Sequence, residues 1–215
     1  MSAAQPLRRR TVVDELADVL RGEILNGAVA AGTPLREVEL AAAYDVSRHT
    51  LRAALRLLAG EGVVEIEPHR GARVASLDRD QLIGLFEVRT ALEIEGARLA
   101  LECNGGRLPV HVHDDLARLA AATRRARVPW SDIAALHADF HAGIVAAAGS
   151  ARLRAEYARL TAELRLFLLQ LRPVWSLERM RTHHEELVAG LESEGPEVLR
   201  RHLEDGAAAV LAALD

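Results

Sequence analysis

The stretch DVSRHTLRAALRLLAGEG, from Asp45 to Gly62, combines two kinds of side chain at helical spacing. Its apolar residues fall within about 100° of one another around a helix axis and predict a buried stripe. They are Leu51, Ala54, Leu55 and Leu58. Three arginines four residues apart form an adjoining stripe: Arg48, Arg52 and Arg56. We therefore expect a helix that packs one side into a core and turns its guanidinium side to an anionic partner.

The residues before this segment predict two more helices. Apolar positions at helical spacing predict a helix over Thr11–Leu25, and a shorter helix is expected over Glu37–Tyr44. The AAGTPL stretch between them is expected to be a loop. Ser47 is a suitable N-cap for the arginine helix, which is expected to end at about Ala59, before two glycines. The short helix, the tight turn and the capped helix together predict a helix-turn-helix.

A hairpin is expected directly after the arginine helix. The stretch VVEIEPHRGARVASL has two β-rich pieces on either side of Pro68–Gly71, and Gly71 can adopt positive φ at the tip. The second helix of a helix-turn-helix fits the major groove of DNA, and His69 and Arg70 on the hairpin could reach phosphates or the minor groove. A surface helix with ordinary charges is the alternative. The order of turn, serine cap and hairpin favours DNA binding.

Composition limits the remaining classes of protein. The 215 residues are 50% hydrophobic and 3% aromatic, which favours helices over a β-sandwich. A formal net charge of −4 argues against a wholly basic nucleic-acid coat. One cysteine, no secretory signal and no apolar segment long enough to span a membrane favour a cytoplasmic protein.

The second part of the chain shows only helical periodicity. Six helices are expected, at 79–103, 109–126, 131–148, 151–171, 177–192 and 197–213. The fold class predicted is mostly α, with a winged helix-turn-helix domain over 1–76 and an all-α six-helix bundle over 77–215. No linker of low complexity separates the two.

The first domain resembles a known family. The stretch ILNGAVAAGTPLREVELAAAYDVSRHTLRAALRLLAGEGVVEIEPHRGARV, Ile24–Val74, is similar to the winged helix of GntR-type bacterial transcription regulators. The resemblance implies that Arg48 and Arg52 contact operator bases or backbone. It also implies assisting contacts from other residues, namely Arg36, Ser47, Thr50, Arg70 and Gly71. Where many relatives carry an arginine in the second helix, this chain has Val38, so a contact there is expected to be absent.

The second domain resembles the FCD effector domain of the FadR/VanR branch of that family. LFEVRTALEIEGARLA, Leu85–Ala100, carries the R-x-x-L-E pattern, and HADFHAGIVAAAGS and HHEELVAGL extend the resemblance more weakly. Six helices fit the VanR-like subtype. The resemblance implies a dimer that senses a small molecule and binds a palindromic operator.

Nine histidines occur in the chain, and four match positions of the metal site of that family. The family pattern is an Asp and a His four residues apart on one helix, with two later His. His141 matches the first His, His184 and His202 match the later ones, and His137 stands where the family has Asp. Two imidazoles four residues apart project from one helix face. The alternative is that these are polar bundle residues satisfied by hydrogen bonds, and His183 is expected to lie outside the set.

An all-imidazole set suits Zn²⁺, Ni²⁺ or Cu²⁺ better than Mg²⁺ or Ca²⁺. A metal ion held only by neutral imidazoles keeps more net positive charge than one that also has a carboxylate ligand, so it should attract an anionic effector. We therefore expect a small carboxylate, with Arg89 as a second anchor. The sequence therefore predicts a repressor that its effector releases from DNA. Two other classes stay open at this point: a metal-dependent enzyme that uses the histidines, and a helical interaction module. Activation in place of repression also stays open.

Overall fold

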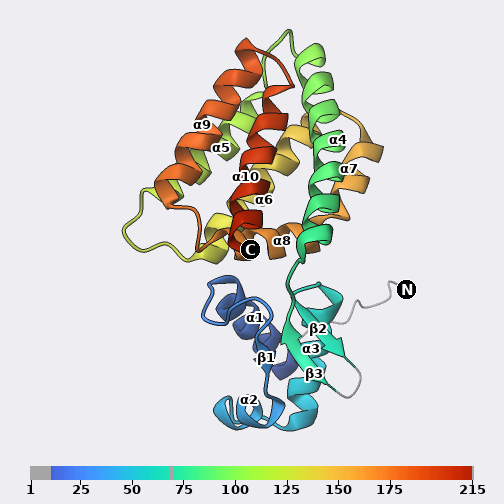
Figure 1. Cartoon of the computed structure of the whole chain (residues 1–215), viewed down its shortest axis with the longest axis vertical. Coiled ribbons are helices and arrows are strands. Elements are labelled where there is room, and N and C mark those ends of the chain that lie inside the picture. Colours follow the sequence, from blue (N-terminus) through green and yellow to red (C-terminus); the bar gives the residue numbers. More distant parts are fainter. Residues whose placement is uncertain (1–10, 68–69, 215) are drawn as a thin grey trace, which may run out of the picture. The chain divides into compact units, whose positions relative to one another are not determined.

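In a computed structural model, the chain packs as two compact units, and the structure describes residues 11–67 and 70–214. The first unit comprises residues 11–24 and 28–75, and the second comprises residues 25–27 and 76–214. Helices α1, α2 and α3 and a small sheet make up the first unit, and the described residues of the second unit form helices and no strand (Figure 1). Within the described residues, no helix is both long and apolar enough to cross a membrane.

The first unit is built from α1 (Val12–Leu25), β1 (Pro34–Leu35), α2 (Glu37–Ala43), α3 (Arg48–Gly60), β2 (Val64–Glu67) and β3 (Gly71–Val74). The predicted helices and hairpin are confirmed. The expectation of a simple loop at AAGTPL was wrong, because Pro34 and Leu35 pair with Arg73 and Ala72 of β3. Strand β3 thus lies between β1 and β2 in an antiparallel sheet.

A tight turn sets the angle between α2 and α3. Asp45 has a left-handed backbone, with φ of 50°, where glycine is the usual residue. Its N–H bonds to Ala42 O and the Val46 N–H bonds to Ala41 O, which satisfies two carbonyls at the end of α2. Aspartate tolerates this backbone conformation better than most residues. The turn lets the next helix begin immediately at a new angle.

The second unit contains α4 (Arg79–Cys103), α5 (Val110–Thr123), α6 (Trp130–Ala147), α7 (Ala151–Ala158), α8 (Thr161–Leu171), α9 (Leu177–Ser193) and α10 (Val198–Leu214). The helix expected over 151–171 is divided, so the described part of this unit has seven helices and not six. The N–H groups of Arg159 and Leu160 bond three residues back, to Glu156 O and Tyr157 O, so the helix tightens there and changes direction. Neither Gly nor Pro marks this break.

Helix α6 packs against both α4 and α5, and α10 packs against α4 and α9. Close approach of α4 to α6 depends on Gly96, because a Cβ there would lie 3.0 Å from Val145 Cα. The inner faces of α4, α6, α9 and α10 therefore face one small interior, which positions the histidines.

Candidate functional site

Helix α3 begins with a complete cap. The Ser47 hydroxyl accepts a hydrogen bond from Thr50 N at 3.0 Å, and the two hydroxyls lie 2.9 Å apart. The cap satisfies one of the N–H groups that a helix start leaves free. Ser47 and Thr50, both predicted to assist DNA contact, therefore also fix where the arginine stripe starts.

The two stripes of α3 separate as the sequence predicts. The residues of its apolar stripe are at most 1% exposed, and they are Leu51, Ala54, Leu55 and Leu58. The three arginine side chains are exposed. Arg48 and Arg56 make no ion pair with any residue that the structure describes, whereas Arg52 Nε donates to Glu37 Oε2 of α2 at 2.7 Å. The helix thus combines a firmly packed side with a cationic, accessible one.

The other predicted contact residues of this unit are also exposed. The Arg36 side chain is 74% exposed and lies 3.8 Å from Glu39, and Arg70 is 81% exposed and 3.3 Å from Glu67. Gly71 has φ of 85°, as expected at the hairpin tip. Val38, at the position where many relatives carry an arginine, is exposed on α2. His69 lies outside the described residues.

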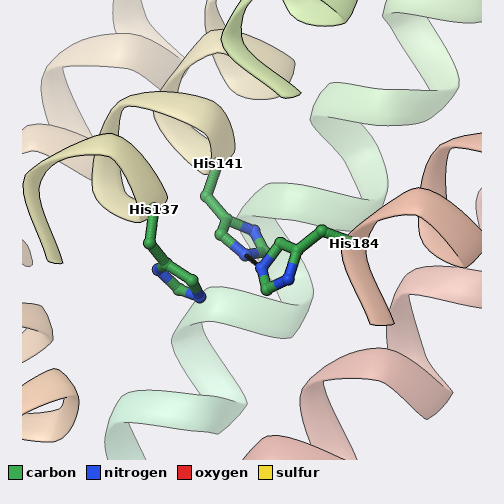
Figure 2. Close-up of side chains that lie close together, drawn as sticks. All are labelled: His137, His141 and His184. Atoms are coloured by element: carbon green, nitrogen blue, oxygen red, sulfur yellow. Dashed lines mark hydrogen bonds between the residues drawn. The ribbon is translucent and has the colours of Figure 1, made fainter. Parts of the chain in front are cut away.

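In the second unit, α6 and α9 bring three histidines together. Figure 2 shows His137 and His141 projecting from α6 toward the ring of His184 on α9. One ligand atom of each lies within 4.8 Å of the others, and all three side chains are buried. The spacing of four residues puts the two α6 rings on one helix face, with centroids 4.6 Å apart.

Hydrogen bonds orient two of these imidazoles. His184 Nδ1 lies 2.6 Å from the backbone oxygen of Met180, and His141 Nδ1 lies 2.7 Å from Glu93 Oε2. Both oxygens act as acceptors, so each Nδ1 carries the proton and each Nε2 keeps its lone pair. The two Nε2 atoms face each other at 3.3 Å. Two nitrogens bound at about 2.1 Å to a tetrahedral ion lie about 3.4 Å apart, so the pair fits a transition metal.

Burial keeps these imidazoles in the form that binds a metal. It lowers the pKa of His137, His184 and His202 well below the ordinary value, because a charged ring would lose its hydration. Burial also lowers the pKa of His141, although Glu93 opposes this. All four rings are therefore neutral at pH 7, and a neutral imidazole is the metal ligand.

Glu93, for which the sequence predicted no role, is central to the site. Glu93 Oε1 accepts hydrogen bonds from Arg89 Nε and the Tyr157 hydroxyl, each at 2.8 Å. Burial alone would raise the pKa of Glu93, but Arg89 and His141 outweigh it and lower the pKa to about 2. The signal available in the sequence was the four-residue spacing from Arg89 to Glu93, which allows an ion pair on one helix face.

Arg89, the predicted effector anchor, is 1% exposed and lies beside a small cavity. The cavity has a volume of about 10 Å³, and its lining includes Arg89, His137, His141 and His202. A volume of about 10–15 Å³ holds one water molecule, so the space suits a single ion or water.

The fourth predicted ligand, His202 of α10, is buried, and its ring centroid lies 5.3 Å from that of His141 and 4.8 Å from that of His184. Ligand atoms of His183, His184 and His202 lie within 4.8 Å of one another. Two overlapping sets of three therefore share His184: one is His137, His141 and His184, and the other is His183, His184 and His202. The sequence placed His183 outside the predicted ligand set, because His184 has the core spacing on α9.

Two family models match the chain, one in each unit. Residues 12–74 match the gntR family of bacterial regulatory proteins, and residues 84–212 match the FCD domain. The chain belongs to the GntR family. Its helical unit is an FCD domain.

Relatives of known description cover nearly the whole chain. The "Probable D-xylose utilization operon transcriptional repressor" of Paenarthrobacter nicotinovorans is 30% identical over 99% of this chain and 92% of its own length. The transcriptional repressor GlaR of Escherichia coli is 28% identical over 86% of this chain and 89% of its own. A crystal structure of a GntR regulator from Rhodococcus sp. RHA1 matches with a TM-score of 0.66 and 26% identity. The match covers 94% of this chain and 98% of that one. This GntR protein is therefore a DNA-binding transcriptional regulator and not an enzyme.

Proposed function

We propose that this regulator is a repressor that binds a palindromic operator as a homodimer through the arginine side of α3. The observation that carries the proposal is the separation of the α3 stripes, with Leu51, Leu55 and Leu58 buried and the arginines accessible. Arg48 and Arg52 contact base edges or backbone, and Arg36 and Arg70 contact phosphates. In a dimer the two α3 helices would enter successive major grooves about 34 Å apart.

The bond between Arg52 and Glu37 supports a role in base recognition. Arg52 donates to Glu37 through Nε, and a guanidinium has five N–H donors in a fixed fork. The two terminal nitrogens therefore stay available for a guanine edge while Glu37 holds the plane of the fork. A side chain held in this way loses less freedom on binding than a mobile one.

We further propose that the histidine cluster of the FCD domain holds a divalent transition metal, with Zn²⁺ or Ni²⁺ preferred. His141 and His184 would bind through Nε2, and His137 would be the third ligand. Glu93 and the Met180 carbonyl keep the first two rings in the required tautomer. When bound, such an ion supplies positive charge that can hold a carboxylate.

The effector in this proposal is a small organic acid, with Arg89 as its second anchor. The cavity of about 10 Å³ is too small for such a molecule, so its binding must displace lining side chains, which come from α4, α6, α8, α10 and the segment between α8 and α9. This displacement is the physical means by which the effector would alter the helical bundle and release DNA. A coupling of about 1–3 kcal/mol gives several-fold to hundredfold control. The site of action is the cytoplasm, where the operator is.

A footprint on the DNA upstream of the gene tests the DNA part of the proposal. Arg52→Ala should weaken operator binding by about 5- to 150-fold, because a bidentate base contact contributes about 1–3 kcal/mol. Arg152→Ala on α7, whose side chain is 85% exposed, is the matched control and should protect like the wild type. Equal protection by the Arg52 variant would contradict the role given to α3.

Calorimetry tests the effector part separately. Protein loaded with Zn²⁺ is titrated with small organic acids, and the His141→Ala variant is compared with the wild type. The proposal predicts binding by the wild type and strong weakening in the variant. Equal binding by both would reject the role of the metal while leaving the DNA interface untouched.

A further inference from the structure

His183 lies directly against His202 at the outer side of the histidine cluster. The two rings stack with centroids 4.1 Å apart and an interplanar angle of 21°. His183 Nδ1 and His202 Nδ1 are both buried, and neither has a hydrogen-bond partner among the described residues. Buried polar atoms are nearly always paired, so two adjacent unpaired imidazole nitrogens point to a ligand.

A solvent-open pocket adjoins this pair between α9 and α10. Its volume is about 220 Å³, and its lining includes His183, Glu186, His202 and Asp205. His202 also lines the inner cavity of about 10 Å³ that His137 and His141 share. His202 therefore lines both the outer pocket and the inner cavity.

The outer pocket has the charge and donor types that attract a cation. His183 Nε2 donates to Asp205 Oδ2 at 3.3 Å, which leaves the lone pair of a neutral His183 on Nδ1. Glu186 and Glu194 add two carboxylates, and Arg201 is paired with Glu194 at 2.7 Å. Imidazole and carboxylate together suit divalent transition metals.

We propose that His183, His184 and His202 form an outer metal position through which a divalent transition-metal ion reaches the inner position of His137, His141 and His184. The inference rests on the inner site proposed above and adds the route to it. The ion is first held at the outer pocket and then moves inward as His184 and His202 pass it to the α6 histidines.

The shared ligand determines the stoichiometry. His184 Nδ1 is engaged with the Met180 oxygen, so only Nε2 can bind an ion. One nitrogen cannot serve two ions, so the outer and inner positions are alternatives for a single ion. His183 therefore affects how fast the ion is exchanged and not how many ions are held.

Stopped-flow loading of the full-length protein with Co²⁺, followed by visible absorption, tests this route. His183→Ala should slow both loading and release by about tenfold, which corresponds to about 1.4 kcal/mol of lost stabilisation for the ion in transit. The equilibrium affinity and the stoichiometry of one ion should not change. His183→Gln, which keeps a polar side chain of similar size, should show the same slowing if the variant is folded by circular dichroism.

His113→Ala is the matched control, because His113 on α5 also pairs with a carboxylate, that of Glu192, at 3.0 Å. It should load and release Co²⁺ at the wild-type rate. Loading of the His183 variants at the wild-type rate would overturn the proposal, as would a loss of affinity with unchanged loading. If the wild type takes up no ion, both the inner site and the route to it are rejected. If the wild type takes up the ion and the His183 variants load and release it at the same rate, only the route is rejected.

Discussion

Replacing Glu93 with glutamine should destabilise the FCD domain strongly, although the two side chains have nearly the same shape. Glu93 is 0% exposed and is hydrogen-bonded to Arg89, His141 and Tyr157. Its pKa falls from 4.5 to about 2 on folding, and each pKa unit corresponds to about 1.4 kcal/mol, which gives about 3 kcal/mol at neutral pH. Leaving the buried Arg89 charge without its partner is independently expected to cost about 3–5 kcal/mol.

The assay is urea unfolding followed by tryptophan fluorescence. The chain has two tryptophans, Trp130 and Trp175, and both lie in the helical unit, so the signal reports on that unit. Glu95→Gln is the matched control, since Glu95 is on the same helix but 46% exposed and paired with Arg98. Exposed ion pairs contribute about 0–1 kcal/mol. Glu93→Gln should therefore lower the free energy of unfolding by about 3 kcal/mol more than the control does.

The dependence on pH gives a second, sharper measurement. The folded-state pKa of Glu93 is lowered, so the stabilisation is complete above the unfolded value of 4.5 and is lost as pH falls toward about 2. The difference in unfolding free energy between wild type and Glu93→Gln should shrink across that window. A difference below about 1 kcal/mol at pH 7, no larger than that of an exposed pair, would refute the reasoning.

Three further outcomes follow from the structure. Arg48→Ala should weaken operator binding and lower the slope of log affinity against log salt by about 1, because one phosphate or base contact is lost; an unchanged slope and affinity would count against it. Gly96→Ala should reduce the unfolding free energy by about 1–3 kcal/mol, since its Cβ would lie 3.0 Å from Val145 Cα, whereas Gly84→Ala, with nothing within 4 Å, should raise it by about 0.5–1 kcal/mol. His137→Asp should shift metal preference from Zn²⁺ toward Mn²⁺, measured by competition between the two ions, and an unaltered preference would exclude His137 as a ligand.

The winged-helix unit was predictable because its signals are local. The periodicity of Leu51, Leu55 and Leu58, the Ser47 cap and the glycine at the hairpin tip each act within a few residues. The small strand β1 was missed because its two residues are extended only through pairing with β3, which is 37 residues away at Leu35 and Ala72. Pairing at that distance leaves no pattern in a two-residue segment.

The sequence by itself determined that His137 and His141 share a helix face, because four-residue spacing is a property of any α-helix. Only the tertiary structure decided that His184 joins them and that His202 stacks on His183. Those relations depend on how α9 and α10 are rotated against α6, which distant packing residues control. The tertiary structure also decided the role of Glu93. The contact of Glu93 with His141 joins α4 to α6 across 48 residues of sequence. Local periodicity gives each helix its faces, and side-chain packing determines which faces meet.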